Sequence, residues 1–129
     1  MNSRTRTQLI KEAAYRLGFD FVGVAKAEKM DEESRRLEAW LNKGMHGKMQ
    51  YMENYFEKRT DPTKLVEGAK SVVTLMYNYF PKEKQPETGT LKIAKYAYGK
   101  DYHPIIRHKL KALLQIINEE IGEVHGRCF

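Results

Sequence analysis

The sequence contains very little cysteine: among its 129 residues only Cys128 carries a thiol. A single thiol excludes an internal disulfide, and it excludes a structural zinc site or an iron–sulfur cluster built from this sequence alone. No run of about 18 apolar residues is present, so no stretch has the length of a membrane-spanning helix. The polar and basic start, Met1 to Thr7, lacks the apolar stretch of a secretory signal. These absences predict a cytoplasmic protein.

The short motifs of common catalytic sites are also absent. We find no glycine-rich phosphate loop, no nucleophile elbow and no pair of histidines at metal-binding spacing. The carboxylates of Asp101, Glu119 and Glu120 have no evident partner in the sequence. The residues alone therefore indicate no complete catalytic constellation and no metal site, and they favour a ligand-binding portion of a protein.

Positive charge is present in excess. The chain has 23 Lys and Arg against 17 Asp and Glu, a net charge of +6 and a pI near 9.4. Clustered cations favour a polyanionic partner such as nucleic acid, because binding releases counterions, although solubility alone can account for such a surplus. Basic residues of the second half that surround one polar segment are Lys82, Lys84, Lys92, Lys95, Lys100, Arg107, Lys109 and Lys111.

The spacing of apolar residues predicts alternating helices and strands. We expect helices over 7–17, from Asp31 or Ser34 to Gly44, over 45–56 and over 104–121, strands over 19–25 and 71–80, and a strand beginning at 126–129. The connecting segments are expected to be a charged connector at 57–62, a short helical turn at 65–69, a mobile loop at 82–90 and an extended segment at 91–98. The pattern predicts an α/β or α+β fold with a small mixed sheet flanked by helices.

The predicted helix over 45–56 would place Met45, Met49, Met52 and Phe56 on one face. An ordinary core stripe explains this pattern, because methionine fills irregular gaps; a cover for a large flat cofactor is the alternative. His46, between Met45 and Gly47, is more typical of a structural turn residue than of a ligand.

The densest polar segment is Lys92–Pro104, which lies between an extended segment and the long last helix. Gly99 permits a close approach of a ligand, and Pro104 suits the first helical position. The polar side chains should therefore lie on a loop before a helix N-terminus. The candidate hydrogen-bonding or acid–base residues of this segment are Tyr98, Asp101, Tyr102 and His103, although half-buried packing tyrosines would give the same pattern.

Four segments, in order, resemble the N-terminal part of the epoxyqueuosine reductases: Leu17–Ala25, Gly44–Met52, Glu57–Pro62 and Tyr96–His103. Members of that family use cobalamin and [4Fe–4S] clusters to remove the epoxide oxygen of a modified wobble base in tRNA. The resemblance implies that Arg59 and Ala94 contact cobalamin, that Tyr98, Asp101, Tyr102 and His103 belong to the substrate face or a proton relay, and that the anticodon arm of tRNA is the partner. Reversing the charge of Lys82, Lys84 and Lys100 should then weaken tRNA binding.

The resemblance also implies that the family's proton-donor aspartate would follow Phe129 and that the cluster cysteines belong to a later ferredoxin-like domain. Residues 1–129 are thus expected to form the cobalamin-side domain of a longer oxidoreductase, inactive alone. Because the last expected strand is cut short, an exposed sheet edge could favour self-association. The alternative hypothesis is a stand-alone basic RNA-binding module without a redox cofactor.

Overall fold

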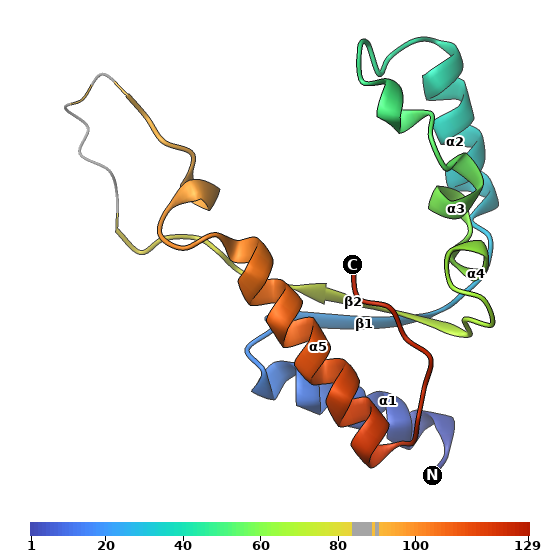
Figure 1. Ribbon diagram of the computed structural model, residues 1–129, viewed down its shortest axis with the longest axis vertical. Helices are drawn as coiled ribbons and strands as arrows, with labels where there is room; N and C mark the ends of the chain where they lie inside the picture. The colour runs from blue at the N-terminus through green and yellow to red at the C-terminus, as the bar shows by residue number, and fades with distance from the viewer. Residues whose placement is uncertain (84–88, 90) are drawn as a thin grey trace. The chain divides into compact units, whose positions relative to one another are not determined.

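The computed structural model describes residues 1–83, 89 and 91–129 and divides into two compact units (Figure 1). The first unit comprises Met1–Gly23 and Thr74–Phe129, and the second comprises Val24–Val73. Lys84 and most of the loop expected at 82–90 lie outside the described residues. Within the described part of the chain, no helix is both long and apolar enough to cross a membrane.

The first unit is built on two helices, α1 (Ser3–Arg16) and α5 (Tyr102–Glu120), which pack against each other. The Asn2 side chain caps α1 by accepting a hydrogen bond from the Thr5 N–H, at 2.8 Å. The core of this unit is small and consists of Ala13, Ala14, Phe19, Val22 and Leu113. Burial of these apolar side chains fixes α5 relative to α1 and therefore fixes the start of α5, where the candidate site lies.

The two strands, β1 (Phe21–Lys26) and β2 (Ser71–Met76), pair with each other. The Asp20 N–H donates to the Met76 carbonyl at one end and the Ala27 N–H donates to the Lys70 carbonyl at the other, so the pair is antiparallel. Only glycine fits beside Thr74 at position 23, because a Cβ built on Gly23 would lie 2.7 Å from Thr74 Oγ1, too close for a side chain. The expected class, helices flanking a small sheet, is confirmed in its α+β form.

The second unit contains four short helices. They are α2 (Asp31–Asn42), the 3₁₀ turn η1 (Gln50–Met52), α3 (Phe56–Thr60) and α4 (Pro62–Leu65). Three acidic residues in the first turn of α2 suit the positive end of its dipole. The Asp61 side chain caps α4 through the Thr63 N–H, at 3.0 Å.

The helix expected over 45–56 is wrong. Gly44, Gly47 and Tyr55 have positive φ angles of 65°, 57° and 57°, so the backbone turns repeatedly where a helix would need a uniform right-handed conformation. Met45 is 62% exposed as a result and shares no core stripe with Phe56. The spacing of Met45, Met49, Met52 and Phe56 suggested the stripe, and the left-handed conformations of Gly44 and Gly47 prevent the helix that would have formed it.

Other boundaries also differ from the expectation. The predicted connector at 57–62 contains helical turns, because α3 ends at Thr60 and Pro62 starts α4. The short helical turn expected at 65–69 corresponds to α4 and therefore lies earlier in the chain. The strand expected over 71–80 ends at Met76. The extended segment at 91–98 contains the 3₁₀ turn η2 (Lys95–Ala97), and 126–129 forms no strand with any described residue.

The last helix begins two residues earlier than Pro104. Asp101 caps it, Tyr102 is its first residue, and Pro104 occupies the first turn, where no intrahelical N–H is needed. Gly122, with φ of 135°, follows the C-cap residue Ile121, so the helix ends close to the expected position 121. After α5 the chain folds back along the helix, where the Val124 N–H donates to the Asn118 side chain at 2.9 Å and Gly126 lies against Leu114 (Figure 1).

Candidate functional site at the start of helix α5

Asp101 organises the start of α5. Its Oδ1 accepts a hydrogen bond from the His103 N–H at 3.0 Å and lies 2.7 Å from His103 Nδ1. The backbone hydrogen bond from His103, followed by the one from its ring, lowers the pKa of the Asp101 carboxyl below its ordinary value. The ionised carboxylate can only accept, so Nδ1 of His103 donates and Nε2 is the nitrogen left for another partner.

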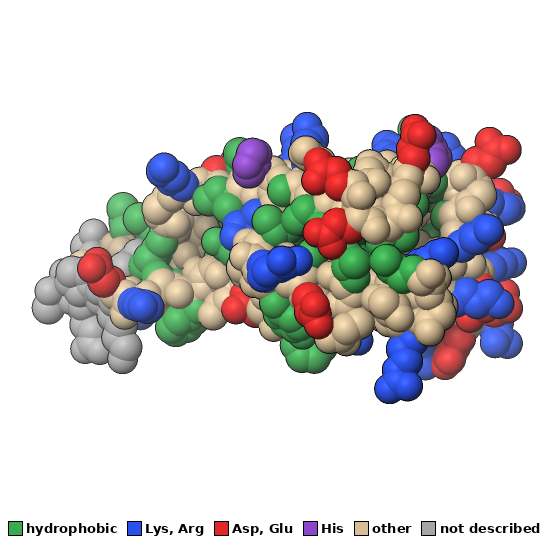
Figure 2. All heavy atoms as spheres, turned by 90° about the horizontal axis from the view of Figure 1, so that it is seen from below, with side chains coloured by type: hydrophobic (Ala, Val, Ile, Leu, Met, Phe, Trp, Pro, Cys, Tyr) green, Lys and Arg blue, Asp and Glu red, His purple; other side chains and the backbone are tan. Residues whose placement is uncertain are grey.

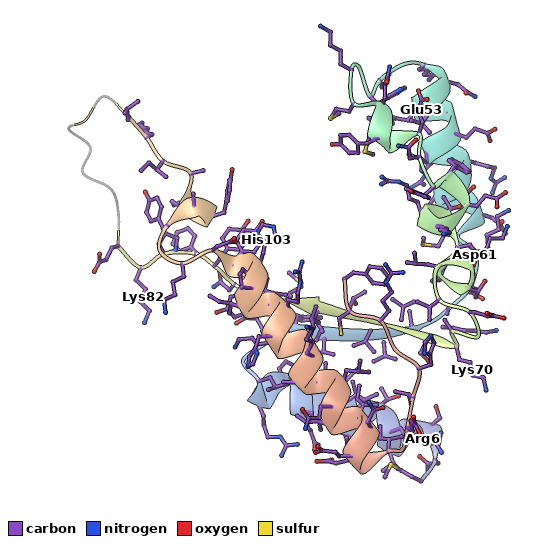
Figure 3. All side chains as sticks on the ribbon, in the orientation of Figure 1. Arg6, Glu53, Asp61, Lys70, Lys82 and His103 are labelled. Carbon is purple, nitrogen blue, oxygen red and sulfur yellow. The ribbon has the colours of Figure 1, made fainter. Side chains whose placement is uncertain are left out.

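The side chains of Asp101 and His103 are both 66% exposed, and Figure 3 shows His103 at the first turn of α5. A carboxylate that orients an imidazole is an arrangement used for acid–base work, because it fixes the ring and its tautomer. The geometry therefore gives His103 the ability to accept or donate a proton at an exposed surface.

The His103 ring also belongs to a stack of three aromatic rings. The Tyr79 and Tyr102 ring centroids are 5.7 Å apart with an interplanar angle of 18°, and those of Tyr102 and His103 are 4.1 Å apart at 23°. We call Tyr79, Tyr102 and His103 the aromatic stack. Tyr102 is half-buried, whereas Tyr79 is 54% exposed. The sequence predicted Tyr102 and His103 as neighbours in a site, but it gave no reason to include Tyr79.

Tyr79 is held in place by the segment that precedes it. Asp20 Oδ2 accepts a hydrogen bond from the Asn78 N–H at 2.6 Å, and Asn78 Oδ1 accepts one from the Phe80 N–H at 2.9 Å. Beyond the stack, Lys95 Nζ lies 4.2 Å from the centroid of the Phe80 ring, a cation–π contact. These contacts order the chain that leaves β2, and the stacking of Tyr79 on Tyr102 joins it to the start of α5.

Two hollows lie in this part of the first unit, and one of them borders the aromatic stack at His103. The first, of about 400 Å³, runs along α5, and we call it the basic groove; its lining residues are Asp101, His103, Pro104, Arg107, His108 and Lys111. The second, of about 580 Å³, lies where the segment after β2 meets the turn before α5; its lining residues are Pro81, Lys82, Glu83, Ile93, Ala97, Tyr98 and Gly99. Tyr98 therefore lines a different hollow from Asp101 and His103.

The two expected cofactor contacts belong to different units: Ala94 to the first and Arg59 to the second. Ala94 is exposed and extended, with φ −61° and ψ 139°, directly before η2. The Arg59 guanidinium donates to the Asn54 carbonyl at 2.9 Å from Nε and to the Tyr51 carbonyl at 3.1 Å from Nη2. Arg59 is thus not paired with Glu57 or Asp61, and its Nη1 group is left for another acceptor.

The second unit contains a buried histidine, His46, which the sequence predicted as a structural turn residue. The His46 side chain is 8% exposed, its Nε2 lies 2.7 Å from Glu53 Oε1, and its ring lies 5.7 Å from the Trp40 ring. Its Nδ1 has no hydrogen-bond partner within the described part of the chain. The predicted structural role of His46 agrees with this burial, and no group of three His, Cys, Asp or Glu side chains forms a metal site among the described residues.

Comparison with known proteins defines the class to which this fold and site belong. The sequence model of the family described as "Epoxyqueuosine reductase QueG, DUF1730" matches residues 59–129, more than half of the chain and all of the candidate site at α5. The chain belongs to the epoxyqueuosine reductase family.

Particular relatives agree with this assignment. The epoxyqueuosine reductase of Cyclobacterium marinum is 60% identical over 124 residues, and that of Escherichia coli K12 is 33% identical over 129 residues; each match covers 95% of this chain. The match covers 40% of the first protein and 33% of the second, so the chain spans well under half of their length. The names of these relatives do not favour the alternative of a stand-alone RNA-binding module.

Solved structures give the same result. A crystal structure of selenomethionine-labelled epoxyqueuosine reductase superposes with a TM-score of 0.84 at 26% identity, covering 96% of this chain and 34% of that one. The structure of epoxyqueuosine reductase from Streptococcus thermophilus gives 0.74 at 25% identity, covering 92% of this chain and 32% of that one. The likeness extends over both units.

Proposed function

We propose that this chain forms the cobalamin- and tRNA-facing portion of an enzyme that reduces epoxyqueuosine to queuosine at the wobble position of tRNA in the cytoplasm. Family membership over the α5 site is the observation that carries the proposal. The reaction removes the epoxide oxygen as water: two C–O bonds break, a C=C bond forms, and two electrons and two protons are consumed. Reduced cobalamin, recharged by [4Fe–4S] clusters, supplies the electrons when bound.

The first unit has a surface that suits a flat corrin ring. Leu91 and Tyr96 are 86% and 56% exposed, Ala94 adds only a methyl group, and a Cβ built on Gly99 would meet nothing within 4 Å. Small and apolar exposed groups allow a large ring to approach the backbone closely. Ala94 and Arg59 are the residues that we assign to the cofactor, and clusters are assigned to a part of the enzyme outside this sequence.

The residues of the α5 site would act on protons and on the substrate. His103, oriented by Asp101, can hold a proton at Nε2 and deliver it toward an opening epoxide, and Tyr98 and Tyr102 add hydroxyl groups for orientation. The family's proton-donor aspartate is assigned to a later segment, so these residues form the substrate face or a relay. Exposed Lys82 and Lys100 would bind phosphates of the anticodon arm, which position the tRNA without reading its sequence.

Each strand of the two-stranded sheet pairs with one neighbour among the described residues, which leaves its other edge able to pair with a further strand. We propose that a further strand of the enzyme, or of a second copy, occupies such an edge. Size-exclusion chromatography of the chain over a range of concentrations would show a dimer if a second copy does so.

Cobalamin binding is tested by titrating the chain with cob(II)alamin and recording its visible spectrum. We expect saturable binding that Ala94→Arg abolishes, since the bulky cation would occupy the ring's position. Ala39→Arg, at an exposed position of α2, is the matched control and should bind as the unaltered chain does. Absence of binding, or equal effects of the two variants, would contradict the assignment of Ala94.

The activity is tested with the product of the gene that encodes this chain, tRNA containing epoxyqueuosine, cobalamin and a low-potential reductant. Nucleoside mass spectrometry should show queuosine appearing as epoxyqueuosine disappears. Unchanged epoxyqueuosine in the presence of bound cobalamin would overturn the proposed reaction.

A further inference from the structure

The aromatic stack presents more ring surface than the fold needs. Core tyrosines are normally covered, yet Tyr79 is 54% exposed and the His103 side chain is 66% exposed, with Tyr102 half-buried as the ring that both contact. Exposed rings held in parallel by their neighbours form a rigid platform, and little conformational entropy is lost when another flat group stacks on it. Nucleobases are such groups, and stacking on aromatic side chains is tolerant of base identity.

The basic groove is continuous with the stack, because His103 belongs to both. Arg107 and Lys111 follow His103 at intervals of four residues on α5, so these three side chains lie on one face of the helix. The groove contains one carboxylate, that of Asp101, and its Oδ1 is already engaged by the N–H and Nδ1 of His103. The cationic side chains of Arg107 and Lys111 have no hydrogen bond or ion pair with any described residue, and both are exposed.

We propose that the aromatic stack and the basic groove together bind single-stranded RNA: an unpaired base stacks on the exposed rings of Tyr79 and His103, and Arg107 and Lys111 contact the adjoining phosphates. The inference rests on the proposed function, since it assigns to these residues a part of the tRNA loop next to the base that reacts. Proteins hold unpaired nucleotides with aromatic rings that stack on the bases and with nearby cationic side chains that contact the phosphate backbone.

General attraction by the net charge does not account for this arrangement. On the face seen in Figure 2, Lys and Arg side chains are interspersed with Asp and Glu side chains and form no single basic block. Long-range attraction to such a surface would not distinguish unpaired from paired nucleotides. The aromatic stack would, because bases within a duplex do not expose their faces.

The test uses the chain with two labelled probes at equal length: a single-stranded RNA of mixed sequence and the corresponding blunt RNA duplex. Tyr79→Leu removes the ring and keeps an apolar side chain, and Tyr79→Phe keeps the ring. Tyr15→Leu is the matched control, because Tyr15 is an exposed tyrosine of the same unit on α1. Circular dichroism of each variant verifies that the fold is retained.

We expect Tyr79→Leu to weaken binding of the single strand by at least about 5-fold, while Tyr79→Phe and Tyr15→Leu stay within about 2-fold of the unaltered chain. The affinity for the duplex should be the same for the unaltered chain and for all three variants. Equal weakening for strand and duplex, or none for the strand, would overturn the role of the stack.

Arg107→Gln and Lys111→Gln test the groove through salt dependence. Each should lower the slope of log affinity against log salt concentration for the single strand by about 0.7, because one phosphate contact is lost. An unchanged slope would remove the groove from the site. These readouts involve neither cobalamin nor queuosine. Cobalamin binding by the chain and conversion of epoxyqueuosine by the gene product, together with no effect of Tyr79→Leu, would refute this inference alone.

Discussion

Lys109 provides a sharp test of how the start of α5 is held, because its ammonium group is used inside the first unit. Lys109 Nζ donates to the Leu17 carbonyl at 2.5 Å, directly after α1, and lies 5.1 Å from the centroid of the Tyr77 ring. Lys109 is half-buried, and a Cβ on Gly18 would lie 2.8 Å from its Nζ. Replacing Lys109 by Met keeps most of the apolar stem and removes both polar contacts.

The expected loss of stability follows from these two contacts. A hydrogen bond from a charged donor contributes about 1.5–3 kcal/mol, and a cation–π contact at a partly exposed position contributes about 0.5–1 kcal/mol. Partial solvation and the retained stem of the Met side chain both reduce the sum. We therefore expect Lys109→Met to lower the free energy of unfolding by about 2 kcal/mol, which at this chain length corresponds to a fall in Tm of roughly 6–10 °C.

Thermal unfolding followed by far-ultraviolet circular dichroism measures this change. Lys111→Met is the matched control, since Lys111 is an exposed lysine of the same helix, and surface changes of this kind stay within about 0.5 kcal/mol. Lys109→Met should leave the salt slope of RNA binding unchanged. Lys111→Met should lower that slope and leave the Tm unchanged. Equal melting temperatures for Lys109→Met and the unaltered chain would refute the reasoning.

Two further predictions concern stability. The hydrogen bonds from the Thr63 hydroxyl and N–H lower the pKa of Asp61 in the folded state, so this carboxylate stabilises the fold above the unfolded pKa of about 4 and the contribution is lost as the pH falls through the lower folded value. Urea unfolding should show a deficit of Asp61→Asn at pH 7 that shrinks at pH 3, and an equal deficit at both values would contradict this. Leu113, 3% exposed, is the buried residue of α5, so Leu113→Ala should cost about 3 kcal/mol in urea unfolding, and a loss under about 1 kcal/mol would contradict its place in the core.

Regular periodicity made the larger elements predictable from the sequence. The helices now seen as α1, α2 and α5 and both strands were expected near their actual positions, because each has an apolar side that must be buried. The residues at the start of α5 were also expected as a group, because Asp101, Tyr102 and His103 are adjacent in the chain. Adjacency placed them together without any knowledge of tertiary structure.

Features that depend on distant or left-handed residues could not be predicted in this way. Tyr79 stacks on Tyr102 across 23 positions of the chain, next to Asn78, whose N–H is bonded to the distant Asp20, and nothing in the local sequence of either tyrosine indicates that contact. The turns over 44–55 were missed because apolar spacing suggested a helix, whereas Gly44 and Gly47 adopt conformations that only the folded chain reveals. The roles of Arg59 and Ala94 stay predictions.

The antiparallel pairing of β1 with β2 makes residues 27–70, most of the second unit, an insertion between two neighbouring strands. Thr74 and Gly23 are in contact although they are 51 positions apart. The two ends of the insertion are adjacent, because the Ala27 N–H donates to the Lys70 carbonyl at 3.0 Å. Because the cost of closing a loop rises only slowly with its length, residues could be gained or lost within the insertion with little effect on the strands. The insertion is therefore free to diverge in length while the segment after Met76, which carries Tyr79 to the start of α5, keeps its position.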